Sequence, residues 1–378
     1  MLPIHNEITR CRQYGLKGVL GTIISTEGST YQKAGAKCFL SEDGVLTGLV
    51  SGGCVEGDLK EHCKEVLESG LSKRVFYDFR DQGDDLWGLG LGCNGSIEIF
   101  LEVIDPINSP VDAFKKEEIF TIALTKSSCI VTMVGSEDAS FVGNKWIACD
   151  ELPLEKSLPF EQIRSGYKKR KEKEMSGLTI VEICGKKTEV FYEFCQPVPK
   201  VIVFGAGPDA VPLVNGIKLL NWHVSVVDHR PSFVNEEHFP NADQLIYSPK
   251  GSMPTLSLTE NTFIIIMSHH FEQDQMILKE VLGSDTAYVG ILGPRKRTYQ
   301  LFEEINRDLE ITEKTLVNFY NPIGLDIGAK SPEEISFSIL SEMVDVYRGG
   351  NGVSLKVMKG PYQIDSKKDR EEELAFQT

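Results

Sequence analysis

The sequence predicts an α/β protein in which a small mixed α/β N-terminal domain precedes a Rossmann-like, doubly wound parallel sheet. An apolar strand, Val201–Phe204, runs directly into the glycine turn Gly205-Ala-Gly-Pro-Asp-Ala210. Further apolar strands then alternate with helical segments, which is the pattern of a parallel sheet covered on both faces. Two prolines in Pro197-Val-Pro-Lys200 mark the boundary before that sheet. The 378 residues suffice for two or three domains, and we expect an N-terminal domain at 1–196, the Rossmann-like domain at 197–348 and a polar tail at 349–378.

The N-terminal domain shows both helical and strand patterns. Helices are predicted at residues 4–14, 55–67 and 160–173, the second from apolar residues that share one face. Strands are predicted at residues 18–24, 36–40, 45–50, 74–79, 96–104, 119–124, 129–134 and 188–194. The Asp43-Gly44 pair indicates a hairpin turn between the second and third of these strands. Residues 82–95 are so dense in glycine that we expect a loop there.

The Rossmann-like domain is predicted to have strands at residues 201–204, 223–227, 244–247, 262–267, 287–291 and 316–319. Ser331-Pro-Glu-Glu334 combines an N-cap serine, a proline at the first helical position and a glutamate three residues after the serine. This combination is the signature of a capping box. The charge run at 365–373 indicates a solvated end of the chain.

Composition excludes several classes of partner. The formal net charge of −15 and the isoelectric point near 5.1 disfavour nucleic acid or an anionic membrane as the main partner. No apolar run is long enough for a membrane span, and the N-terminus lacks the features of a secretory signal, so we expect a cytoplasmic protein. The nine cysteines include no C-x-x-C pair, which disfavours both a disulfide framework and a zinc ribbon.

The turn after the first Rossmann strand matches the G-x-G-x-x-[GA] pattern, so Gly205 and Gly207 are candidate cofactor-binding residues. Asp228 ends the next strand, about 20 residues farther on, where an acidic residue can accept the ribose hydroxyls of NAD(P). Arg230 either meets a phosphate or pairs with Asp228. Asp209, however, places a carboxylate where a pyrophosphate needs N–H donors. Two interpretations therefore stand side by side: a dinucleotide site, and a Rossmann scaffold whose site has been altered.

Further candidates follow the carboxyl ends of later strands, where open α/β sheets bind ligands. His269 and His270 follow the strand at 262–267, with Asp274 close behind. They could move protons, bind a metal or simply be hydrogen-bonded parts of the structure. Arg295 begins a run of three basic residues that either holds a phosphate or is solvated. We take His269 and Arg295 as candidate cofactor-binding residues.

Three glycine-rich loops of the N-terminal domain suggest a ligand cradle. In Ser51-Gly52-Gly53-Cys54 the glycines allow backbone N–H groups to face an anion, and a cysteine at a helix start has more thiolate character. Such a thiolate can act as a nucleophile or bind a metal, and a small buried cysteine is the alternative. Glu56 is a candidate acid or base, or a charge at the first helical turn. The other two loops are residues 28–36 and Gly92-Cys-Asn-Gly95.

Taken together, these motifs resemble the xanthine dehydrogenase accessory family, XdhC/CoxI, over nearly the whole chain. The resemblance rests on Gly28-Ser29 with Gly35-Ala-Lys37, Ser51-Gly-Gly-Cys-Val-Glu56, Gly92-Cys-Asn-Gly95, Gly205-Ala-Gly207 with Val227-Asp-His-Arg-Pro231, and Asn321-Pro-Ile-Gly-Leu-Asp-Ile-Gly328 with Ser331-Pro-Glu-Glu334. The last block is the most specific of them.

The resemblance implies an accessory factor that binds the molybdenum cofactor (molybdopterin), supports its sulfuration together with a cysteine desulfurase, and inserts it into an apo xanthine dehydrogenase-type enzyme. A homodimer is also implied. Cys54 and Cys93 are then the expected molybdenum or sulfur contacts, with Cys54 as the candidate metal ligand. Lys33 takes the place of a basic residue that the family often carries after the glycine–serine pair.

The leading interpretation is therefore a cofactor-maturation chaperone rather than a turnover enzyme. An NAD(P)-dependent oxidoreductase that uses the Rossmann-like domain, with His269 or His270 in proton transfer, is the alternative. A third interpretation is a non-catalytic regulator that uses the Rossmann-like domain to dimerise.

Overall fold

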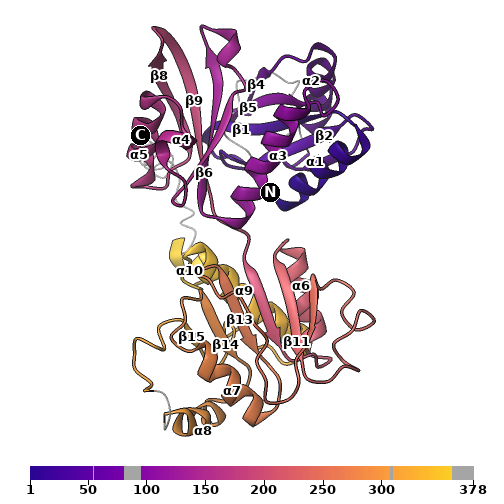
Figure 1. The fold of residues 1–378 in the computed structure, drawn as a ribbon, viewed down its shortest axis with the longest axis vertical. Coiled ribbons are helices and arrows are strands. Elements are labelled where there is room, and N and C mark those ends of the chain that lie inside the picture. Colours follow the sequence, from indigo (N-terminus) through magenta and orange to yellow (C-terminus); the bar gives the residue numbers. More distant parts are fainter. Residues whose placement is uncertain (54, 81–94, 307–309, 360–378) are drawn as a thin grey trace, which may run out of the picture. The chain divides into compact units, whose positions relative to one another are not determined.

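The computed structural model describes residues 1–53, 55–80, 95–306 and 310–359. The described residues form two compact units, Met1–Pro197 and 198–359, and the colours of Figure 1 pass from indigo and magenta in the first to orange and yellow in the second. Each unit has its own sheets and its own core, and each is described separately below.

The first unit contains a five-stranded antiparallel sheet with the order β3-β2-β1-β5-β4. Its strands are β1 (Gly18–Gly28), β2 (Lys37–Ser41), β3 (Leu46–Gly48), β4 (Lys73–Asp78) and β5 (Gly95–Ile104). Side chains alternate between its two faces, as strand geometry requires. Val19 and Ile23 pack with helix α2 (Glu56–Ser69) on one face, whereas Leu20 and Phe39 pack with α1 (Leu2–Tyr14) and α3 (Pro110–Thr125) on the other.

A second antiparallel sheet in this unit has the order β7-β6-β9-β8. Its strands are β6 (Ser128–Ser136), β7 (Lys145–Cys149), β8 (Gly177–Ile183) and β9 (Lys186–Cys195), with the 3-10 turn η1 (Ala139–Phe141) and the helices α4 (Leu154–Ser157) and α5 (Glu161–Lys171). Helix α5 contributes Ile163 and Tyr167 to a core that includes Val131, Met133 and Tyr192 of the sheet. The first unit is thus mixed α/β, as predicted.

One predicted strand is wrong. Residues 119–124 lie inside the helix α3, which begins at Pro110. The buried residues of that helix recur at spacings of three and four, which is the period of a helix face. They are Ala113, Lys116, Glu117, Ile119, Phe120, Ala123 and Leu124. The apolar run alone could not separate a buried strand from the inner end of a helix. The strands β7 and β8 were not predicted.

The second unit is a six-stranded sheet in which every pair of neighbours is parallel. The order is β12-β11-β10-β13-β14-β15, which is the 3-2-1-4-5-6 order of a Rossmann fold. The strands are β10 (Lys200–Phe204), β11 (His223–Asp228), β12 (Gln244–Tyr247), β13 (Thr262–Ile266), β14 (Tyr288–Ile291) and β15 (Phe319–Tyr320). The predicted fold class is therefore confirmed.

Helices cover both faces of this parallel sheet. Helices α6 (Ala210–Leu219) and α9 (Pro332–Arg348) pack against Val201 and Val203, while α7 (Phe271–Val281) and α8 (Arg295–Ile305) pack against Ile202 and Phe204. The predicted capping box is present at the start of α9. A short helix, α10 (Leu355–Lys359), lies within the predicted polar tail. Among the helices that the structure describes, none has the length and apolarity needed to cross a bilayer.

Candidate functional site

The glycine turn of the second unit brings its backbone close to neighbouring strands. Gly205 has φ 123°, and a Cβ added there would lie 2.3 Å from the carbonyl oxygen of Met267 at the end of β13. Only glycine fits a position that combines positive φ with so close a backbone approach. The N–H of Ala206, the next residue, points to Asp228 and donates to its Oδ2 at 2.6 Å.

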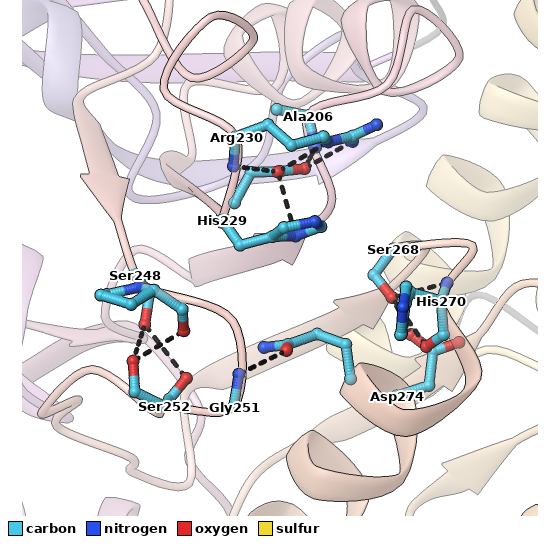
Figure 2. Close-up of polar contacts among 12 residues, drawn as sticks. Ala206, His229, Arg230, Ser248, Gly251, Ser252, Ser268, His270 and Asp274 are labelled. Atoms are coloured by element: carbon cyan, nitrogen blue, oxygen red, sulfur yellow. Dashed lines mark hydrogen bonds and ion pairs between the residues drawn. The ribbon is translucent and has the colours of Figure 1, made fainter.

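Asp228, the predicted ribose ligand, is already bound by its own chain, and Figure 2 labels two of its partners, Ala206 and Arg230. Its side chain is 1% exposed, and Oδ2 also meets Arg230 Nη2 at 2.7 Å. Oδ1 accepts from Arg230 N at 2.8 Å and from Nε at 2.9 Å. Burial raises the pKa of Asp228, but the hydrogen bonds from Arg230 and Ala206 outweigh burial and leave this pKa below its ordinary value. Of the two roles predicted for Arg230, the structure shows the pairing with Asp228.

His269 contacts Asp209 rather than Asp228. His269 Nε2 lies 2.7 Å from Asp209 Oδ2, and this contact joins the turn after β10 to the loop after β13. Ser268, one residue earlier, donates to the buried carboxylate of Asp274, whose other oxygen lies 2.6 Å from Arg297 Nη2. Arg297, rather than the predicted Arg295, therefore joins this group of loops.

Arg295 takes a different contact, because its Nε donates to the carbonyl oxygen of Asn321 at 3.3 Å. A small cavity lies between the strand ends and is lined by residues that include Gly205, Asp228, Ser268 and Gln273. Gln273 was not singled out in the sequence, since its role depends on the packing of α7. Its Oε1 accepts from Gly251 N at 3.2 Å, which ties α7 to the loop after β12. Figure 2 labels Gly251 in that loop.

The two histidines that follow β11 and β13 face one another at the same edge of the sheet. The rings of His229 and His270 are 6.2 Å apart and nearly perpendicular. His229 Nδ1 lies 3.4 Å from Asp228 Oδ1, whereas the buried Nδ1 of His270 has no hydrogen-bond partner among the described residues. In residues 1–53, 55–80, 95–306 and 310–359, no group of three or more His, Cys, Asp or Glu side chains is arranged to hold a metal.

In the first unit, Ser51 and Glu56 fix the turn that leads into α2. Glu56 Oε1 accepts from Ser51 N at 3.0 Å and Oε2 accepts from Ser51 Oγ at 2.5 Å. Burial raises the pKa of Glu56, but its hydrogen bonds, above all those from Ser51, hold it below the ordinary value. Ser51 Oγ in turn accepts from Gly53 N at 3.2 Å and from Val55 N at 3.4 Å. These N–H groups therefore bind Ser51, and the acid or base role of Glu56 stays a prediction.

The described ends of the three glycine-rich loops meet in the first unit. The ring of Tyr31 lies 3.7 Å from the position that a Cβ on Gly52 would take. A Cβ on Gly95 would lie 2.8 Å from the carbonyl oxygen of Ser29, and Gly95 pairs with Gly28 in the β1–β5 ladder. Loop 28–36 thus touches both other loops.

The predicted cysteine contacts, Cys54 and Cys93, lie outside the described residues. The predicted Lys33 is exposed in loop 28–36. Lys37 holds the end of this loop, and the sequence analysis named it only as part of the family motif Gly35-Ala-Lys37. The Lys37 ammonium donates to Gly35 O at 3.1 Å and lies 2.5 Å from Glu193 Oε1. Its side chain is 3% exposed. A lysine at a buried position of a strand is almost always paired with an acidic residue, and this was the signal in the sequence from which a partner could have been expected.

The comparisons with known proteins agree along the chain. Residues 11–78 match the model of the XdhC and CoxI family, and residues 201–343 match that of the XdhC Rossmann domain. The chain is 30% identical over 329 residues to a probable xanthine dehydrogenase subunit of Bacillus subtilis, and the match covers 87% of this chain and 92% of that protein. It is 32% identical over 87 residues to the molybdenum cofactor insertion chaperone PaoD of Escherichia coli, covering 23% of this chain and 26% of the chaperone.

A solved structure supports the same assignment. The crystal structure of a xanthine dehydrogenase from Bacillus halodurans superposes with a TM-score of 0.70 at 29% identity, covering 93% of this chain and 98% of that one. The resemblance read from the motifs is therefore confirmed. On the strength of these similarities, which extend over most of its length, the chain belongs to the XdhC and CoxI family.

Proposed function

We propose that this chain is a molybdenum-cofactor-binding accessory protein that supports sulfuration of the cofactor and inserts it into a xanthine dehydrogenase-type molybdoenzyme. Family membership and the name of the chaperone PaoD support this proposal. The structural observation that carries it is the contact of loop 28–36 with the other two glycine-rich loops, because it brings the Tyr31 ring to the exposed backbone of Gly52 in a loop that also carries the exposed Lys33.

The described residues at this meeting point suit a planar, anionic cargo. Tyr31 is 60% exposed and lies against the backbone of Gly52, so its ring offers a face on which a pterin can stack. Lys33 supplies a cation in the same loop. Gly52 is exposed and has no side chain, which leaves its backbone accessible to a ligand.

The two predicted cysteines belong to the same loops in the sequence. Cys54 directly follows Gly53, and Cys93 precedes Gly95 by two positions. In this proposal the thiolate of Cys54 contacts molybdenum or its sulfur, Cys93 assists, and a cysteine desulfurase supplies the sulfur. The protein acts in the cytoplasm, as a homodimer, and its partner is the apo-molybdoenzyme.

A transfer experiment tests the proposal. The protein is incubated with released cofactor, freed of excess by gel filtration and mixed with an apo xanthine dehydrogenase-type enzyme, whose activity is then followed. We expect the wild type to restore activity and Cys54→Ala and Cys93→Ala to restore much less. Cys184→Ala is the matched control, because Cys184 is an exposed cysteine in the turn between β8 and β9. If both loop variants deliver cofactor as well as the control does, the proposal fails.

A further inference from the structure

Asp209 occupies the N-cap position of α6 but does not cap the helix. An N-cap aspartate ordinarily accepts a hydrogen bond from the second or third N–H of its helix. Asp209 makes no such bond, and its Oδ2 instead meets His269 Nε2 at 2.7 Å. The contact that the local sequence favours is therefore replaced by a contact between two loops.

The partner of Asp209 also adopts an unfavourable local arrangement. His269 has φ 57°, in the left-handed region that non-glycine residues seldom occupy and that persists only where the surroundings hold it. The missing cap at Asp209 and the left-handed backbone at His269 are thus two locally disfavoured features, and both accompany the same contact between these side chains. Backbone strain of the kind seen at His269 is concentrated at functional sites in proteins.

The carboxylate lies against the second glycine of the turn. A Cβ added to Gly207 would be 2.4 Å from Asp209 Oδ1. In a dinucleotide-binding Rossmann domain, that glycine has no side chain so that the pyrophosphate can approach its backbone. A carboxylate oxygen of the chain itself therefore covers the surface that a pyrophosphate would need.

The basic side chains nearby are engaged by carboxylates of the same chain. His269 is paired with Asp209, and Arg230 is paired with Asp228. The pKa of Arg230 is raised, chiefly by its hydrogen bonds to Asp228 and in smaller part by the charge of Asp209. Both acidic side chains thus act on the basic groups that a phosphate would otherwise meet.

We propose that Asp209 is a built-in anion that fills the pyrophosphate position of this Rossmann domain and thereby excludes dinucleotides from it. Its charge repels a phosphate that approaches Gly207, and its contact with His269 joins the turn after β10 to the loop after β13 without being needed for the exclusion. Replacing Asp209 by a neutral residue uncovers Gly207, the N-terminus of α6 and His269 at once. The inference concerns the second unit and is independent of the proposed function of the first.

Dinucleotide binding to single variants tests this inference. NADH is titrated into the full-length protein and followed by its fluorescence, and ADP-ribose is titrated by calorimetry. We expect Asp209→Ser to bind both at least about tenfold more tightly than the wild type, because a like charge next to the diphosphate has been removed. Serine is chosen because it can still cap α6. Asp285→Ala is the matched control, since this exposed aspartate precedes β14, at the other end of the strands from the turn.

A third variant separates exclusion by charge from simple closure. His269→Ala breaks the ion pair but keeps the Asp209 carboxylate, so we expect its affinity for NADH to stay at the level of the wild type. The inference is overturned if a folded Asp209→Ser protein, verified by circular dichroism, binds no better than Asp285→Ala. It is equally overturned if the wild type already binds NADH as tightly as Asp209→Ser, or if His269→Ala gains the same affinity.

Discussion

The turn before α2 depends on a reciprocal contact between Ser51 and Glu56, and replacing Glu56 by alanine should loosen it. The substitution removes the acceptor of both the backbone N–H and the hydroxyl of Ser51. It also releases the Ser51 hydroxyl, which accepts from Gly53 N and Val55 N. The local chain that leads into and out of Cys54 therefore loses the contact that fixes its geometry.

The magnitude follows from the two bonds that are lost. Hydrogen bonds to a charged group contribute about 1.5–3 kcal/mol each in favourable cases, and the partial exposure of Glu56 reduces this through solvent screening. We expect Glu56→Ala to lower the free energy of unfolding by about 1–3 kcal/mol. Ser51→Ala should have a similar effect, and the double variant should cost less than the sum of the two, with a coupling of at least about 0.5 kcal/mol.

Urea unfolding of the four proteins of this double-mutant cycle measures the coupling. Glu61→Ala is the control, since its carboxylate is on the surface of the same helix, is 66% exposed and pairs only with Lys64 in the described structure. A surface substitution of this kind should change stability by less than about 0.5 kcal/mol. Strictly additive losses, or a Glu56→Ala protein as stable as Glu61→Ala, would refute the reasoning.

Three further predictions concern stability. Glu102 is 1% exposed between Lys116 and Lys145, so Glu102→Leu should lower the free energy of unfolding by about 3–5 kcal/mol, with Lys145→Met in the same chain recovering part of it. Urea unfolding checks this, and a loss below about 1 kcal/mol would contradict it. Burial raises the pKa of Glu102, but the two lysines hold it at about 2 instead of 4.5. The contribution of ionised Glu102 to the free energy of unfolding is thus complete above pH 4.5 and is lost as the pH falls toward 2. In Glu102→Leu, the free energy of unfolding should lack this part of its dependence on pH. Ser331→Ala removes the side-chain oxygen that accepts a hydrogen bond from Glu334 N at the start of α9. It should lower the free energy of unfolding, measured by thermal unfolding, by about 1 kcal/mol, and Ser331→Thr should lower it less.

The second unit could be predicted from its sequence because strand, turn and helix each leave a local signal. The apolar run Val201–Phe204 and the glycine turn after it identify the first strand, and the capping box at Ser331 identifies the last long helix. In the first unit, the apolar residues 119–124 at the end of α3 have the same composition as a buried strand. The spacing of apolar residues in so short a run cannot distinguish a strand from a helix. Strand β8 was missed because most of its residues are only partly buried.

The contacts of the candidate sites were harder to predict than the elements that carry them. Asp228 and Arg230 are two residues apart, so their pairing was one of the interpretations that the sequence allowed. Asp209 and His269 are 60 residues apart, and only the order of β10 and β13 in the sheet brings them together. Loop 28–36 was recognised as a candidate cradle, but the Lys37–Glu193 pair beneath it joins residues from two different sheets.

The molybdenum and pterin content of the protein, purified from a host that makes the cofactor, tests the central claim most directly. Metal analysis and fluorescence of the oxidised pterin are read on one sample each of the wild type, Cys54→Ala and Cys184→Ala. We expect pterin and molybdenum in roughly stoichiometric amounts in the wild type and in Cys184→Ala, and a loss of both in Cys54→Ala. A wild type that carries no pterin, even after incubation with released cofactor, would contradict the proposed function.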